Sequence, residues 1–143
     1  MPITADHVGR SYPATKPYRV SRAKIAEFAT ALGDQNPAYF DADGPIAPPT
    51  FAAVIAAQAW GALFGDPELG LALQRTMHAD QRFDIVRPLR EGDDVVATLT
   101  IERVRNRGNT DMVTIGVELA TVDGEPLGTA TSQLIHTRQE AAE

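Results

Sequence analysis

The sequence contains no cysteine, which excludes disulfide bridges, thiolate metal sites and cysteine nucleophiles. It is also short of positive charge: 13 lysines and arginines stand against 19 aspartates and glutamates, giving a formal net charge of −6. A nucleic-acid-binding protein is expected to have the opposite balance, so we expect no nucleic-acid partner. Its three histidines show no spacing typical of metal ligands, and we expect no metal site.

Long hydrophobic runs are missing as well. The longest uninterrupted apolar stretch covers residues 51–64, whereas a membrane-spanning helix needs about 20 apolar residues. The first residues lack the basic and then apolar pattern of a signal peptide, so we expect a cytoplasmic protein with no membrane partner. The length of 143 residues favours a single domain over 1–143, with an extended arm at 1–17 and a flexible tail at 138–143.

The stretch 46–65, IAPPTFAAVIAAQAWGALFG, carries no charged residue and predicts one buried helix. The two prolines suit the beginning of a helix, and the Thr50 hydroxyl is expected to cap the first turn. Alanines and larger apolar residues fall on every side, which predicts a helix covered all round. A sheet could wrap closely around such a surface.

A second, amphipathic helix is predicted from the cap residue Ser21 to about Leu32, and Gly33 ends it. Tyr18–Val20 is a possible short strand before it. After the central helix, alternating apolar residues predict four long strands, over about 77–86, 95–101, 113–119 and 127–137.

Short turns between these strands favour a consecutive antiparallel meander. In the last strand Gly128, Ala130 and Ser132 share a face that we expect to lie against the helix. The fold class is therefore α+β, with one central helix wrapped by a curved antiparallel sheet.

The run IAEFATALGDQNPAYFD followed by IAPPTF resembles the hydratase motif of the MaoC-like hotdog proteins, and the HADQRF segment at 78–83 is similar to theirs too. The resemblance covers most of the chain and is strongest to actinobacterial MaoC N-terminal-domain subunits of heterodimeric dehydratases. It implies a hotdog fold and reversible loss of water from a (3R)-hydroxyacyl thioester. Asp34 holds the motif's catalytic aspartate position and Asn36 its asparagine, but Tyr39 holds the position of the catalytic histidine.

That tyrosine matters because the reaction needs a general base and a proton donor, and neutral tyrosine is a poor base near pH 7. The resemblance therefore implies the substrate-binding protomer of a dehydratase or trans-2-enoyl-thioester hydratase, working with a histidine-containing MaoC-type partner. The substrate would be carried on coenzyme A or on the phosphopantetheine of an acyl carrier protein, with no other cofactor. Long sheet edges predict pairing, as a homodimer or a heterodimer.

The resemblance gives Asp34 and Tyr39 as the degenerate catalytic pair. It gives as substrate-binding residues Asn36, Pro49, Thr50, Phe51 and Gln81. From the residues alone, without the resemblance, Asp34 and Asn36 are better explained as turn and cap residues. A further hypothesis brings the clustered arginines at 103–107 to the coenzyme phosphates.

Other functions stay open. A self-paired, non-catalytic hotdog protein that binds acyl thioesters would need no histidine. A hotdog thioesterase is disfavoured, because the helical stretch 51–64 has no aspartate or glutamate to activate water and only Gln58 is polar there. His78 and His136 lie in predicted strands, where satisfied or surface histidines are commoner than catalytic ones.

Overall fold

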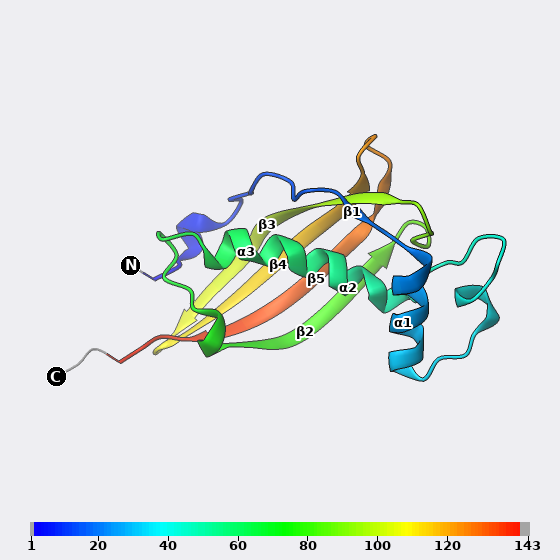
Figure 1. The fold of residues 1–143 in the computed structure, drawn as a ribbon. Helices are drawn as coiled ribbons and strands as arrows, with labels where there is room; N and C mark the ends of the chain where they lie inside the picture. Colours follow the sequence, from blue (N-terminus) through cyan, green and yellow to red (C-terminus); the bar gives the residue numbers. More distant parts are fainter. Residues whose placement is uncertain (1, 141–143) are drawn as a thin grey trace.

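The computed structural model describes residues 2–140 (Figure 1). One antiparallel sheet has the strand order β1-β3-β4-β5-β2. Its strands are β1 (Tyr18–Arg19), β2 (Thr76–Ile85), β3 (Asp94–Arg107), β4 (Thr110–Thr121) and β5 (Pro126–Thr137). The α-helices are α1 (Arg22–Leu32), α2 (Ala52–Ala56) and α3 (Trp60–Phe64), and short 3₁₀ turns cover Ala5–His7, Pro37–Tyr39, Pro49–Phe51, Ala57–Ala59 and Leu73–Arg75. Where the structure describes the chain, no helix is long and apolar enough to span a bilayer.

The central helix is a continuous rod in which 3₁₀ turns alternate with α2 and α3. It begins at Pro49 rather than at Ile46, because Ile46 forms a β-bridge with Arg90 and is held extended. The expected cap is also wrong: Pro48 occupies the N-cap position, and Thr50 lies inside the first turn without a capping hydrogen bond. Proline lacks an N–H, so this helix start leaves fewer donors that need a cap.

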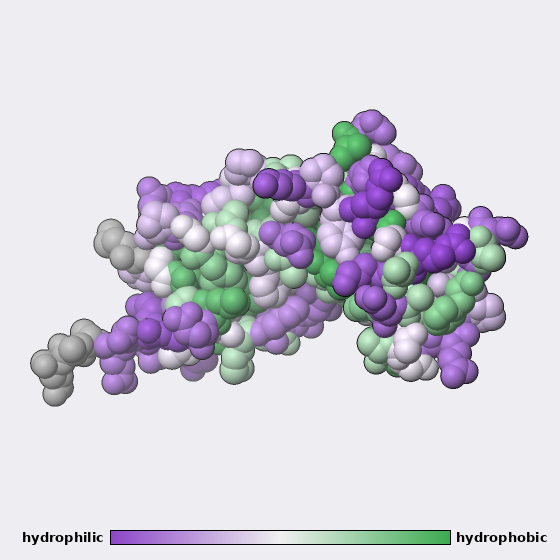
Figure 2. All heavy atoms as spheres, in the orientation of Figure 1, coloured by the Kyte–Doolittle hydropathy of each residue, from purple (hydrophilic) through white to green (hydrophobic). Residues whose placement is uncertain are grey.

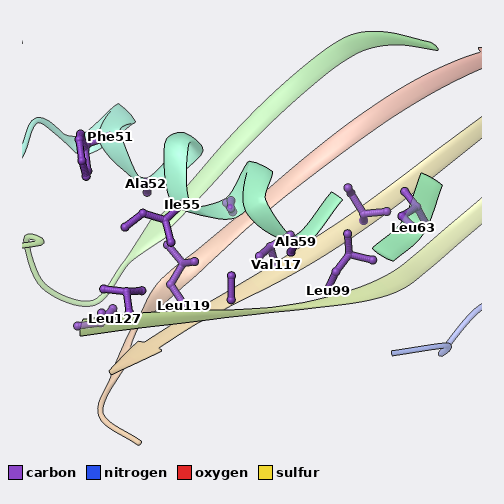
Figure 3. Close-up of a cluster of buried hydrophobic side chains, with 14 of the residues drawn as sticks. Phe51, Ala52, Ile55, Ala59, Leu63, Leu99, Val117, Leu119 and Leu127 are labelled. Atoms are coloured by element: carbon purple, nitrogen blue, oxygen red, sulfur yellow. The ribbon is translucent and has the colours of Figure 1, made fainter. Parts of the chain in front are cut away.

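The rod lies across the concave face of the sheet (Figure 1). Ile55, Ala59 and Leu63 are buried, and they point toward Leu99 and Val117 of the strands (Figure 3). The opposite side of the rod is exposed at Ala57, Gln58, Gly61 and Ala62. The prediction of a helix covered all round is therefore wrong for the single chain, which leaves a strip of small residues open.

The sheet differs from the predicted meander in one strand. β3, β4 and β5 follow one another through hairpins, but β2 pairs with β5 instead of β3. The connection 86–93 crosses the end of the two intervening strands, which are spaced by about 4.8 Å each. Sequence spacing alone favours pairing of neighbours, whereas the actual order lets β2 extend the sheet along the second flank of the helix.

Gly128 also has a different role from the predicted one. Ala130 and Ser132 are buried, as expected for a face turned to the core. Gly128, however, has a positive φ of 151°, and a Cβ there would lie 2.5 Å from the Asp84 carbonyl oxygen of β2. Its missing side chain therefore serves the close approach of β2 to β5.

One edge of the sheet is covered by the N-terminal arm, whereas the other edge is open within residues 2–140. The arm at 2–17 lies along β3: Tyr12 N–H donates to Leu99 O at 3.1 Å and Thr15 N–H to Ala97 O at 3.0 Å. The outer edge of β2 has no strand beside it in the described part of the chain. At the other terminus the Arg138 N–H donates to Asn109 O at 2.8 Å, and residues 141–143 of the predicted flexible tail lie outside the described residues.

Candidate functional site

An apolar cleft opens where the start of the helical rod meets the ends of β2, β4 and β5. It holds about 640 Å³ of space free of protein atoms, including its mouth to solvent. Its lining is largely apolar, as the walls of small-molecule sites commonly are. The wall includes Ile46, Ala52, Phe83, Leu119 and Leu127.

The polar motif that follows α1 borders this cleft only in part. Gly33 ends α1 with a φ of 69°, a left-handed conformation that glycine adopts easily. The Asp34 carboxylate then accepts the Asn36 N–H at 3.0 Å, and the Asn36 side-chain oxygen accepts the Ala38 N–H at 3.0 Å. Asn36 lines the cleft, whereas Asp34 does not. The motif therefore begins as a turn and cap arrangement, with one of its two polar residues at the cavity.

Tyr39 is the most enclosed polar group of the cleft. It is 8% exposed and lines the wall. Its hydroxyl makes no hydrogen bond within residues 2–140, although its ring is packed into the core cluster. A phenol placed in this way can donate to, or accept from, a bound polar group.

The start of the helical rod contributes Pro49 to the cleft but not the two residues after it. Thr50 is exposed. Phe51 is 1% exposed and packs edge-on against Phe28, with ring centroids 5.3 Å apart. The structure thus places Phe51 in the core rather than at the predicted site.

Gln81 likewise lies away from the cleft, where it joins β2 to β5. Its side chain accepts the Ser132 hydroxyl at 2.6 Å and donates to Thr131 O at 3.1 Å. Phe83, two residues further along β2, shares this side of the strand and does line the cleft. Sequence reasoning missed Phe83, although the two-residue period of a strand starting from Gln81 was a signal for it.

Arg87 is a second missed residue of the cleft wall. Its guanidinium donates to Asp93 at 2.8 and 3.0 Å and to Glu125 at 2.8 and 3.2 Å. These hydrogen bonds raise the pKa of Arg87 above its usual value, those to Asp93 most. Burial is the largest single effect and raises the pKa of Asp93, but the hydrogen bonds and charges of Arg87 and Arg90 together lower it more, so the pKa lies below its usual value. With its donors shared between two carboxylates, Arg87 fixes the wall and is not free for a phosphate.

The arginines at 103–107 are far from this cleft. They occupy the end of β3 that pairs with Thr110, whereas the cleft lies at the end of β4 near Leu119. The hypothesis that they meet coenzyme phosphates at the cleft of their own chain is therefore not supported. Within residues 2–140 no group of three histidine, aspartate or glutamate side chains is arranged to hold a metal.

Comparison with known proteins identifies the family of this chain. The family model described as "FAS1-like, dehydratase domain region" matches residues 6–130. The chain belongs to this dehydratase-domain family. The hotdog fold and the MaoC-like resemblance expected from the sequence are confirmed.

The chain is also similar in sequence to proteins of other bacteria. A UPF0336 protein of Cutibacterium acnes is 59% identical over 140 residues, which cover 98% of each chain. A UPF0336 protein of Streptomyces coelicolor is 43% identical, over 99% of this chain and 100% of the relative.

Among solved structures, a chain of the HadBC (3R-hydroxyacyl-ACP dehydratase) complex from Mycobacterium tuberculosis superposes with a TM-score of 0.78 at 26% identity, covering 93% of this chain and 99% of that one. A MaoC-like dehydratase reaches a TM-score of 0.82 at 24% identity, over 92% of this chain and 42% of its own, which supports the fold alone.

Proposed function

We propose that this chain is the substrate-binding protomer of a (3R)-hydroxyacyl-thioester dehydratase or trans-2-enoyl-thioester hydratase. One observation carries the proposal: Tyr39 stands at the cleft where the motif has its histidine, while Asp34 does not line the cavity. The cleft therefore has the form of an acyl site without a converging acid–base pair. The likeness to a chain of the HadBC dehydratase complex supports the reaction class.

The chemistry explains why a partner is needed. Dehydration breaks the C2–H bond and the C3–O bond of the hydroxyacyl group, forms the C2=C3 double bond and releases water. A base must take the C2 proton while an acid protonates the leaving hydroxyl. Tyr39 can hydrogen-bond a substrate but is a poor base near neutral pH. In our proposal a MaoC-type partner with an intact aspartate and histidine supplies both groups.

In our proposal the partner binds at the open edge of β2. The arm seals the edge of β3, so the long unpaired edge in the described structure belongs to β2. Unpaired edges invite strand addition. Because Phe83 and Ile85 of β2 line the cleft, a strand added to β2 borders the cavity as well. The strip of small residues at Ala57 and Gly61 lets a second helix approach closely beside it.

The cleft wall supports the choice of substrate. Its apolar lining suits the acyl part of a thioester, and the carrier is coenzyme A or the phosphopantetheine of an acyl carrier protein. No further cofactor takes part. We place the reaction in the cytoplasm. The alternative is a self-paired protein that binds acyl thioesters without turning them over, which the same Tyr39 substitution favours.

The decisive experiment follows hydration of a short trans-2-enoyl-CoA by the loss of its enoyl-thioester absorbance. The purified chain, alone and mixed with a histidine-containing MaoC-type protomer, is compared with its Asp34→Asn variant. We expect thioester binding without turnover by the chain alone, and turnover in the mixture.

Turnover by the chain alone that Asp34→Asn abolishes would overturn the protomer assignment. Binding that persists while no partner restores turnover would favour the self-paired alternative. Absence of thioester binding would contradict both the protomer assignment and the self-paired alternative.

A further inference from the structure

Three arginines at the end of β3 form a row that the proposed function does not use. Arg103, Arg105 and Arg107, called the arginine row here, are all exposed. A bulge between Ile101 and Arg103 shifts the alternation so that Val104 is buried. Because side chains alternate across a strand, the arginine row lies on the convex face, away from the helical rod. Figure 1 shows this end of β3 at the opposite end of the sheet from α1.

The arginine row has no carboxylate partner among the described residues. None of its three guanidinium groups forms an ion pair, whereas six other arginines do: Arg10, Arg19, Arg22, Arg82, Arg87 and Arg138. The cross-strand neighbours of the row are Thr114, Met112 and Thr110, none of them charged. In an acidic chain that neutralises most of its arginines, three adjacent unpaired ones are a distinct surface.

The acidic residue next to the row turns away from it. Glu102 lies on the same strand, but its carboxylate covers Gly116 of β4, so that a Cβ at Gly116 would collide with it. Gly116 is opposite Thr100, whereas the arginine row is opposite Thr114 and the residues before it. Glu102 therefore forms no ion pair with the row.

The spacing of the row matches a helix. Residues two apart on a strand are separated by about 6.6–6.8 Å, so Arg103 and Arg107 are about 13 Å apart. Residues four apart on an α-helix are separated by about 6 Å along its axis, and residues eight apart by about 12 Å. We propose that the arginine row docks an acidic α-helix of a partner protein, one with carboxylates at positions i, i+4 and i+8.

The composition of the surrounding face favours a protein over nucleic acid or an anionic membrane. Met112 and Ile135 lie in register beside Arg105 and are partly exposed. Arginine and methionine are enriched at protein interfaces, where apolar contacts add to charge pairing. A long polyanion would also meet the remaining surface of a chain whose net charge is −6. The site does not rest on the proposed function, because it lies at the opposite end of the sheet from the cleft.

The test uses the full chain and a labelled helical peptide with glutamates at i, i+4 and i+8, followed by fluorescence anisotropy. A peptide of identical composition, with its glutamates distributed around the helix, is the geometric control. The variant Arg103→Gln/Arg105→Gln/Arg107→Gln is compared with Lys16→Gln/Arg19→Gln/Lys24→Gln, which removes the same charge elsewhere. The row variant loses three exposed charge pairs with the peptide, so we expect it to bind roughly tenfold more weakly.

The control variant should bind as the native chain does, and added salt should weaken native binding. As a second measurement, Arg105→Glu should recover affinity for a peptide whose central glutamate is replaced by lysine. Equal binding of the two peptide arrangements, or equal loss in both variants, would overturn the proposal. So would tighter, row-dependent binding of a DNA duplex or of phosphatidylglycerol vesicles under the same conditions.

Discussion

His136 and Asp111 form a buried pair at the end of the sheet remote from the cleft, with Nδ1 and Oδ2 3.2 Å apart. The Ala72 N–H donates to the other ring nitrogen, Nε2, at 3.2 Å. Nε2 must therefore be the unprotonated acceptor and Nδ1 the donor to Asp111, which fixes the tautomer of a neutral imidazole. Both ring nitrogens are used, so this histidine ties the loop before β2 to β4 and β5 and is not available for acid–base chemistry.

The first prediction is that Asp111→Ala strongly destabilises the protein. Asp111 is 1% exposed and also accepts the Asn106 amide at 2.6 Å, while the Arg138 guanidinium lies 3.2 Å away. Removing one partner of a buried charged network typically costs about 3–5 kcal/mol. Urea unfolding should show a loss of this size, against less than about 0.5 kcal/mol for Glu118→Ala, an exposed acid on the same strand. Equal losses in the two variants would contradict the role of the network.

The second prediction concerns Gly128. Replacement by alanine places a Cβ 2.5 Å from the Asp84 carbonyl oxygen and imposes a φ of 151° that side chains rarely adopt. We expect Gly128→Ala to lower the free energy of unfolding by more than about 1 kcal/mol and to weaken thioester binding, since both residues line the cleft.

Gly61→Ala is the matched control, because it lies in a helix with nothing within 4 Å and should stabilise the chain by up to about 1 kcal/mol. A neutral Gly128→Ala would show that the close approach of β2 to β5 is easily relaxed.

The features that the sequence predicted correctly are local. The apolar run 51–64, the cap at Ser21 and the alternation along β3, β4 and β5 each depend on neighbours within one element. The place of β2 could not be predicted in this way, because its pairing with β5 joins residues about fifty positions apart and competes with a nearer partner. The Asp111–His136 pair was invisible for the same reason, since it exists only once the register of β4 and β5 is set.

The candidate site shows the same division. The motif brought Asn36, Tyr39 and Pro49 to the cleft, because they follow one another at the end of one segment and the start of the next. The Asp34 carboxylate accepts a hydrogen bond from the Asn36 N–H. This agrees with the interpretation of these two residues as a turn. Phe83 and Arg87 come from a strand and loop that only the tertiary fold brings to this wall.

The third prediction is an acid-dependent loss of stability that Arg87 controls. The hydrogen bond from Arg87 lowers the pKa of Glu125, and the pKa of Asp93 is lowered despite its burial. A carboxylate with a lowered pKa stabilises the fold above its unfolded pKa, near 4 for aspartate and glutamate. That contribution is lost as the pH falls through the folded-state value.

Urea midpoints measured from pH 6 down to pH 3 should therefore fall less steeply in Arg87→Met than in the native chain. Arg82→Met, which removes an arginine paired with Asp84 at a more exposed position, should leave the slope unchanged. Parallel slopes for Arg87→Met and the native chain would contradict this account.

The fourth prediction tests the open edge of β2. Ala79 lies at the bulge between His78 and Asp80 and has no register partner on β5. Proline there removes an N–H from β2 at a residue that is out of register with β5, and it should shift the dimer that we propose toward monomer. Light scattering over a dilution series gives the mass, and circular dichroism checks the fold. Ala14→Pro, an exposed alanine on the arm at the other edge, should leave the mass unchanged. If the native chain is monomeric at all concentrations, the proposed pairing is wrong.

The fifth prediction separates binding from chemistry at Tyr39. Tyr39 lines the cleft and its hydroxyl has no hydrogen-bond partner among residues 2–140, so Tyr39→Phe should leave the packing of the ring intact and remove one donor that a ligand could use. A single hydrogen bond contributes about 0.5–1.5 kcal/mol, so the Kd for an enoyl-CoA should rise by less than roughly 15-fold.

If Tyr39 is a wall residue and not the base, turnover by the mixture with a MaoC-type partner should fall by no more than the loss of binding. Calorimetric Kd values and kcat measured on the same preparations decide this. A fall in kcat of about 10²-fold or more, with little change in Kd, would instead identify Tyr39 as an acid–base group.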